Sequence, residues 1–146
     1  MNADHHVILR VVSKGLIPII ILFAFYVQFH GDFGPGGGFQ AGVIFAAAFI
    51  LHAIIFGIGE ARRVAPPWLV RLVLASGVLL YAGVGVASLF MHGNYLDYGA
   101  LDHHDPVHGQ HLGILLVEAG VGLTVTGAMI TIFFTFAGYR SSGSAQ

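Results

Sequence analysis

Charged residues are scarce in this chain, and cysteine is absent from it. Only 9% of its 146 residues are Asp, Glu, Lys or Arg, whereas about 25% is usual in a soluble domain. So few charges cannot cover the surface of a water-soluble globule, and they also exclude a disordered chain and a basic nucleic-acid-binding module. Without cysteine there can be no disulfide, thiolate catalysis or cysteine-based zinc site.

Hydrophobic residues make up 56% of the chain, and the mean hydropathy is +0.82. This composition predicts an all-α integral membrane protein, because four apolar runs are each long enough to cross a bilayer core of about 30 Å. We expect one four-helix membrane domain over residues 1–140 and a disordered polar tail over 141–146. The predicted spans are about 8–29, 39–58, 69–91 and 112–137.

The positive charges predict the orientation of these spans. All six Lys and Arg residues flank the same side of the predicted helices, and the connecting segments 30–38 and 92–111 contain none. By the positive-inside rule, both termini are predicted to be cytoplasmic. The six residues are Arg10, Lys14, Arg62, Arg63, Arg71 and Arg140.

Small residues recur at helical spacing in three of the spans, which is typical of helices that pack closely in lipid. Such stripes serve either the internal packing of the chain or contact with other subunits. We favour partner contact for some of them, because so few polar groups cannot line an ion path alone. The stripes are Gly113, Gly120 and Gly127; Gly42, Ala46, Ala53 and Gly57; and Ser76, Gly83 and Ala87.

Glu118 is the only acidic residue inside a predicted span. An ionisable carboxyl group in the apolar core of the membrane is unfavourable in free energy, so we expect this one to have a functional or structural role. His111 lies seven residues earlier and shares its helical face, whereas the glycine stripe with Gly120 and Gly127 faces the other side. Glu118 is therefore a candidate for the ion path, with a structural hydrogen-bonding carboxyl as the alternative.

His52 is the only histidine inside a span, and we expect a packed, hydrogen-bonded side chain rather than a proton carrier. A haem needs a second axial ligand at a matching depth. None is present, since Met129 lies nearer the middle of the membrane, so no cofactor is predicted. Segment 94–111 is rich in His and Asp, but its spacing fits no specific zinc pattern, and no metal site is predicted.

A glycine-rich segment, 34–42, opens the second predicted span. Glycine permits unusual dihedral angles and close backbone approach, and free N–H groups at a helix start can hold an anion. The segment is therefore either a tight turn that locks the second span against its neighbours or a point of direct ion contact.

The run Pro35-Gly36-Gly37-Gly38-Phe39-Gln40-Ala41-Gly42 resembles the signature of the B-type subunit of the Mrp-type (Mnh/Pha/Sha) multisubunit Na+/H+ antiporters. Segments 94–97 and 117–125 are also similar to that protein, and the similarity covers nearly the whole chain with the same four spans. Two positions depart from the pattern: Asp32 stands near the histidine where many members have a His-Asn pair, and Ala41 replaces a glycine.

This resemblance implies secondary antiport in the bacterial cell membrane, with proton entry coupled to Na+ or K+ exit. It implies assembly with the A, C, D, E, F and G subunits, of which the A and D subunits are expected to carry most protons, and it implies no redox cofactor. The ion-path candidates are Glu118, His111, His52 and Asp32, and the motif and packing candidates are Pro35, Gly36, Gly37, Gly38, Phe39, Gly42, Gly120 and Gly127.

A second interpretation is an ion-translocation subunit of a membrane-bound hydrogenase or a related redox complex, because related modules occur there. The two interpretations share the same fold, so neighbouring genes would distinguish them. In both, the chain is a transport subunit rather than an enzyme.

The orientation can be tested with reporter fusions after Arg140 and after Tyr98. We expect a fusion after Arg140 to show cytoplasmic activity and a fusion after Tyr98 to show periplasmic activity, because the cations flank only the terminal side. Periplasmic activity of the fusion after Arg140 would contradict the predicted topology.

Overall fold

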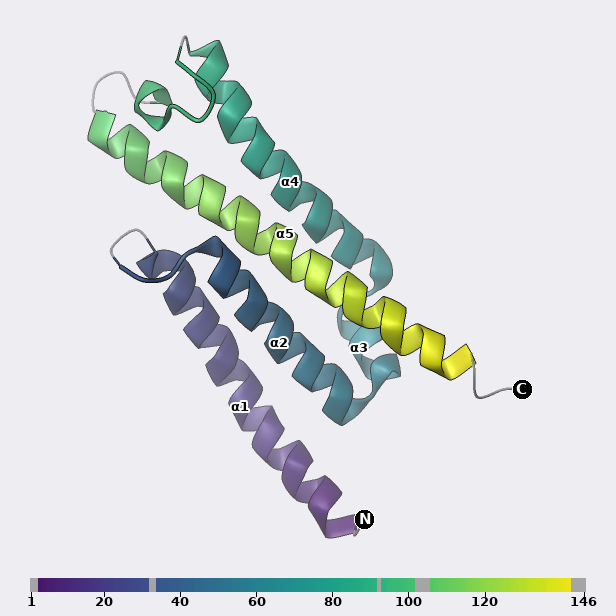
Figure 1. Cartoon of the computed structure of the whole chain (residues 1–146). Helices are drawn as coiled ribbons and strands as arrows, with labels where there is room; N and C mark the ends of the chain where they lie inside the picture. Colours follow the sequence, from purple (N-terminus) through teal and green to yellow (C-terminus); the bar gives the residue numbers. More distant parts are fainter. Residues whose placement is uncertain (1–2, 32–33, 92, 102–105, 143–146) are drawn as a thin grey trace.

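The computed structural model describes residues 3–31, 34–91, 93–101 and 106–142, and all regular structure within them is helical. The short helix α3 and the 3₁₀ turn η1 connect longer helices, as Figure 1 shows. The elements are α1 (Ala3–His30), α2 (Gly38–Phe56), α3 (Ile58–Val64), α4 (Pro67–Phe90), η1 (Tyr98–Leu101) and α5 (Pro106–Ser142).

Four of the helices are long and apolar enough to cross a membrane, which confirms the predicted all-α, four-span architecture. Their large apolar side chains mostly point outward; Phe90 is 83% exposed and Phe136 is 74% exposed. Such exposure suits lipid or a neighbouring membrane subunit and would be unfavourable in water. The spans are Val7–His30, Gly38–Phe56, Pro67–Phe90 and Val107–Gly138.

Helix boundaries differ from the predicted spans in two places. The second span ends at Phe56, because Gly57 adopts a φ of 97° that only glycine readily accepts, and α3 begins just after it. The fourth span begins at Val107, and α5 continues through Ser142, two residues past the predicted boundary of the tail. Residues 143–146 lie outside the described part of the chain.

The four long helices lie in a row with the order α1, α2, α5, α4 (Figure 1). Helix α5 packs against α2 on one side and against α4 on the other, whereas α1 packs mainly against α2. Because successive spans alternate in direction, α2 and α5 run the same way, opposite to α1 and α4. The row gives α5 two neighbours and leaves one side of α1 and one side of α4 without a neighbour from the described chain.

The glycine stripe of α5 packs inside the chain, against α4 and η1. A Cβ atom at Gly77 would lie 2.7 Å from the carbonyl oxygen of Gly120, and one at Gly127 would lie 2.8 Å from Cβ of Leu74. At the outer end, a Cβ atom at Gly113 would lie 2.5 Å from the ring of Tyr98. At each of these glycines the neighbouring atoms lie too close to leave room for a side chain.

On α4, Gly83 of the predicted stripe takes no part in packing within the described chain, which leaves contact with another subunit as its open alternative. This glycine is exposed, and a Cβ atom there would meet nothing within 4 Å. Gly77 and Gly85 make the close contacts instead, Gly77 with α5 and Gly85 with the ring of Tyr95. Gly83 lies six residues after Gly77, which places it on a different face at about 3.6 residues per turn.

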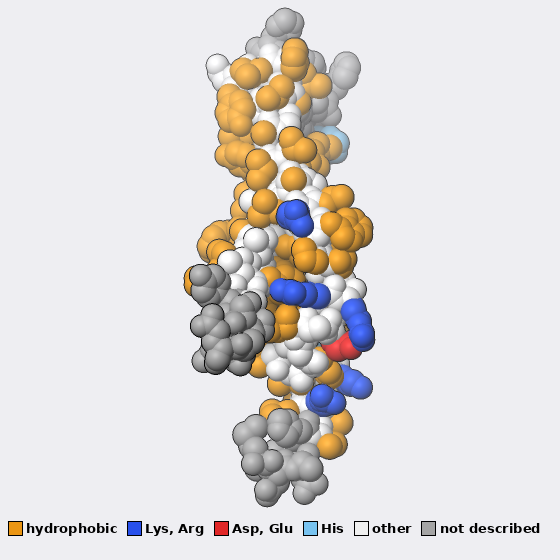
Figure 2. All heavy atoms as spheres, turned by 90° about the vertical axis from the view of Figure 1, so that its right-hand side faces the viewer, with side chains coloured by type: hydrophobic (Ala, Val, Ile, Leu, Met, Phe, Trp, Pro, Cys, Tyr) orange, Lys and Arg blue, Asp and Glu red, His pale blue; other side chains and the backbone are white. Residues whose placement is uncertain are grey.

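The basic residues gather at one end of the row. The start of α1, helix α3, the start of α4 and the end of α5 share this end (Figure 1). Figure 2 shows Lys and Arg side chains in the middle and lower parts of the visible face and none in its upper part. The side chain of Arg140 lies outside the description. The distribution agrees with the one used to predict the orientation, which itself stays a prediction.

Candidate functional site

The glycine segment folds back over the end of α1 before α2 begins. The N–H of Gly34 donates to the carbonyl of His30 at 3.1 Å, and the N–H of Gly37 donates to the carbonyl of Val27 at 3.2 Å. Gly37 has a φ of 114°, a conformation that L side chains rarely adopt. The turn therefore satisfies carbonyl groups at the end of α1 and requires glycine at position 37.

Glu118 of α5 lies directly against this turn. A Cβ atom at Gly31 would lie 2.8 Å from Glu118 Oε1, and one at Gly37 would lie 2.9 Å from the same oxygen. The backbone of Gly38 contacts the backbone carbonyl of Glu118 so closely that it leaves no space for a Cβ atom. The half-buried carboxyl group of Glu118 thus packs directly against the backbone of these glycines, because they have no side chain.

Polar groups from three helices lie further along α5, one to two turns from Glu118. Gln28 Oε1 would be 2.8 Å from a Cβ atom at Gly122, one turn along α5 from Glu118. The hydroxyl of Thr126 is 2.7 Å from the carbonyl oxygen of Gly122 and 3.2 Å from that of Gly42, so it links α5 to α2. Amide, hydroxyl and carbonyl oxygens therefore lie one to two turns along α5 from the carboxyl group of Glu118.

Gln28, Gly31 and Thr126 were missed by sequence reasoning. Gln28 could have been found by the argument that identified Glu118, because an amide within an apolar span also needs a reason. Gly31 and Thr126 carry no such signal, since glycine and threonine are common throughout membrane helices.

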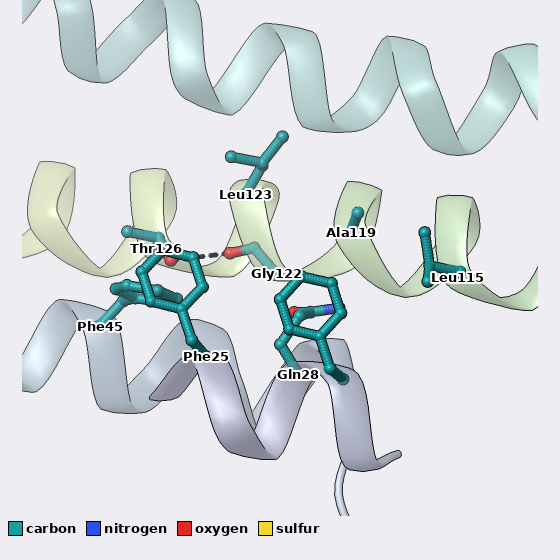
Figure 3. Close-up of a pocket in the computed structure, with 9 residues that line it drawn as sticks. Phe25, Gln28, Phe45, Leu115, Ala119, Gly122, Leu123 and Thr126 are labelled. Atoms are coloured by element: carbon teal, nitrogen blue, oxygen red, sulfur yellow. Dashed lines mark hydrogen bonds between the residues drawn. The ribbon is translucent and has the colours of Figure 1, made fainter. Parts of the chain in front are cut away.

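Beside this contact, a groove of about 400 Å³ runs between α1, α2 and α5. Figure 3 shows Gln28 extending from α1 toward Gly122, with Phe25 and Phe45 next to Thr126. The rings of Phe25 and Phe45 meet edge to face at 4.8 Å. Glu118 does not line this groove, whose walls are almost entirely apolar.

The other predicted ion-path residues do not join Glu118. His111 lies two turns earlier on α5, roughly 10 Å along the axis, and is exposed. His52 lies fourteen residues after Gly38 on α2, roughly 21 Å along it. Asp32 lies outside the described residues.

His52 is packed against Phe56, with ring centroids 4.8 Å apart. Its Nε2 atom is buried and has no hydrogen-bond partner within the described part of the chain. The predicted packing is therefore present, whereas the predicted hydrogen bond is missing at this nitrogen.

The remaining motif residues divide into two groups. Gly36 and Gly42 make close contacts: Cβ atoms there would lie 2.8 Å from the carbonyl oxygen of Val27 and 2.7 Å from that of Gly122, respectively. Pro35 and Phe39 are exposed. Gly36 and Gly42 thus make the close backbone contacts of the motif, whereas Pro35 and Phe39 face outward.

The connection between α4 and α5 packs through tyrosines. Burial, together with the nearby Tyr81 and Tyr95, raises the pKa of Tyr98, so its phenol stays neutral. Residues 102–105 of the His- and Asp-rich segment lie outside the description. Across the described ranges, no three His, Asp or Glu side chains are grouped as metal ligands would be.

These features define a multi-pass helical membrane protein with a carboxyl group in its apolar region, the kind of residue that transporters place along ion paths. A family model described as a domain related to the MnhB subunit of Na+/H+ antiporter matches residues 8–131. The chain belongs to this family.

Curated relatives agree with this assignment. A protein of Staphylococcus haemolyticus (strain JCSC1435), named "Putative antiporter subunit mnhB2", is 34% identical over 140 residues, covering 94% of this chain and 99% of the relative. The protein of the same name from Staphylococcus aureus (strain Newman) is 33% identical over the same shares of both chains.

We expect Gly38→Ala to lower the thermal stability of the full chain in detergent. The added Cβ must push α2 away from the backbone of Glu118, and such overpacking costs about 1–3 kcal/mol. Gly83→Ala is the matched control, because the same change there meets open space and removes a helix-weakening glycine, a gain of up to about 1 kcal/mol. Thermal unfolding, monitored by size-exclusion chromatography, would give the melting temperatures of both variants. Equal shifts in melting temperature would refute the close contact of Gly38 with Glu118.

Proposed function

We propose that this chain is a membrane subunit of a multisubunit monovalent cation/proton antiporter. We further propose that it is required for assembly of the complex and that Glu118, with the glycine turn, contributes to the Na+ (or K+)/H+ pathway. The observation that carries the proposal is the contact of Glu118 Oε1 with the bare backbone of Gly31 and Gly37.

A carboxylate at this position can be neutralised by a proton or by a monovalent cation. An uncompensated charge is costly in an apolar region, so the two compete for the same oxygen atoms. Na+ is a hard cation that prefers oxygen ligands. The amide oxygen of Gln40 lies 3.6 Å from a Cβ atom placed at Gly37, and that of Gln28 lies beside Gly122, one turn along α5 from Glu118. Competition at a single carboxyl group is the elementary step that antiport needs.

The turn between α1 and α2 supports this role. Helix ends offer dipoles and backbone groups that interact with ions. Here the end of α1 and the start of α2 both meet α5 beside Glu118. The N-terminus of α2 carries a partial positive charge, which favours the ionised carboxylate once a proton leaves.

The row of helices supports assembly with partners. Helix α1 packs mainly against α2, and its side chains Leu22, Tyr26 and Phe29 are each more than half exposed. We propose that the exposed sides of α1 and α4 meet the A, C, D, E, F and G subunits in the bacterial cell membrane. The names of the relatives favour an antiporter over a hydrogenase-type module.

The Glu118→Gln and Glu118→Asp variants test the ion-path role. We expect Gln to permit assembly but to lower Na+-driven proton movement in vesicles by about tenfold or more, because it keeps shape while removing proton exchange. Asp should retain partial activity, since it keeps the acid but shortens its reach.

Glu60→Gln is the control, because Glu60 is an exposed carboxyl on α3 that pairs with Arg63. Wild-type transport by Glu118→Gln across the full pH range would make Glu118 a structural carboxyl. Loss of the assembled complex in that variant would assign the residue to subunit contact instead.

We expect the purified chain alone to carry out no antiport. It has one acidic residue within its predicted spans and no complete proton relay of its own. Liposomes with a pH-sensitive dye would be given a Na+ pulse, with the complete complex as the positive control. Robust proton movement by the isolated chain would overturn the subunit role.

A further inference from the structure

A cavity lined partly by polar side chains lies at the basic end of the row, far along α5 from Glu118. It has a volume of about 240 Å³ and lies between α3, α4 and α5. Arg62 comes from α3, Arg71 from α4, and Thr131, Phe134 and Thr135 from α5. We propose that this cavity binds the phosphate group of an anionic phospholipid.

Each arginine is positioned by a contact that leaves part of its guanidinium group available. The guanidinium carbon of Arg62 lies 5.6 Å from the ring centroid of Phe134, as in a cation–π contact. Nε of Arg71 donates to the carbonyl of Pro67 at 3.2 Å. A guanidinium group has five N–H donors in a planar fork that matches phosphate oxygens.

The local charge balance favours an anion. At this end of the described chain the ion pair joins Glu60 to Arg63, so the neighbouring carboxylate is directed away from the cavity arginines. The cavity lining has two arginines and no acidic side chain. It also includes Pro67 at the start of α4, a helix end that no side chain caps and whose dipole is positive.

The threonines of the lining contribute acceptors rather than donors. The hydroxyl of Thr131 donates to the carbonyl of Gly127 at 2.7 Å, and that of Thr135 donates to the carbonyl of Thr131 at 2.8 Å. The arginines are therefore the groups that would hold an anion, and removing their charge is the direct test.

The position of the cavity along the helices selects a lipid rather than a soluble phosphate. The span of α4 begins at Pro67, so Arg71 lies four residues inside it, roughly 6 Å from the helix start. Trp68, beside Pro67, is 62% exposed, as expected for an aromatic residue at the headgroup level. Val70 and Phe134 give the cavity an apolar wall suited to the glycerol and acyl portion.

Native mass spectrometry of the full chain, titrated with phosphatidylglycerol or phosphatidylcholine, tests the proposal. We expect phosphatidylglycerol to bind at least about tenfold more tightly, because each arginine near an anionic headgroup gives a several-fold gain in affinity. The double variant Arg62→Gln/Arg71→Gln should lose this preference, whereas Arg63→Gln, whose side chain does not line the cavity, should keep it.

Arg71→Gln alone is the reserve variant if the double variant does not fold, because the side chain of Arg71 is exposed and bonds only to its own helix. It should lose several-fold in affinity for phosphatidylglycerol. Unchanged lipid binding in these variants, an equal loss in Arg63→Gln, or equal affinity for the two lipids would overturn the site. Displacement of phosphatidylglycerol by millimolar inorganic phosphate would overturn its assignment to lipid.

Discussion

The approach of α2 to α5, backbone against backbone, is the constraint on which the rest of the structure depends. Gly38 meets the carbonyl of Glu118, and Gly42 meets that of Gly122 one turn further along. Thr126 then links the two helices through its hydroxyl. Because α5 also meets α4 through glycine, its separation from both neighbours is fixed by backbone atoms, which cannot change rotamer as side chains do.

This constraint unites the two interpretations of the glycine segment, a tight turn and a point of ion contact. Irregular backbone in an apolar region must be buried or must line a cavity. The turn meets that requirement by donating to Val27 and His30 and by packing against α5. The same packing places bare backbone beside the carboxyl of Glu118, so one arrangement supplies both the lock and the proposed ion contact.

The sequence was sufficient to predict the four spans and the gathering of the cations at one end. The spans follow from the apolar runs, and the gathering follows from where the cations lie relative to spans that alternate in direction. It also identified Glu118 and the glycine motif separately. Their meeting could not be predicted, since helix order in the row depends on contacts between distant segments. Gly83 illustrates the limit: glycine spacing reveals a stripe, but only the partner helix decides that Gly77 makes the contact.

Helix α5 joins the two ends of the molecule, because Glu118 and Phe134 belong to one continuous helix. Rotation of α5 would lift Gly120 from Gly77 on one side and Gly122 from Gly42 on the other, breaking close packing on both. The backbone of Glu118 is therefore fixed relative to the cavity that contains Arg62 and Arg71. The proposed exchange of ions at Glu118 would then proceed through rotation of its side chain, change of its protonation state or movement of a partner subunit, rather than through rotation of α5.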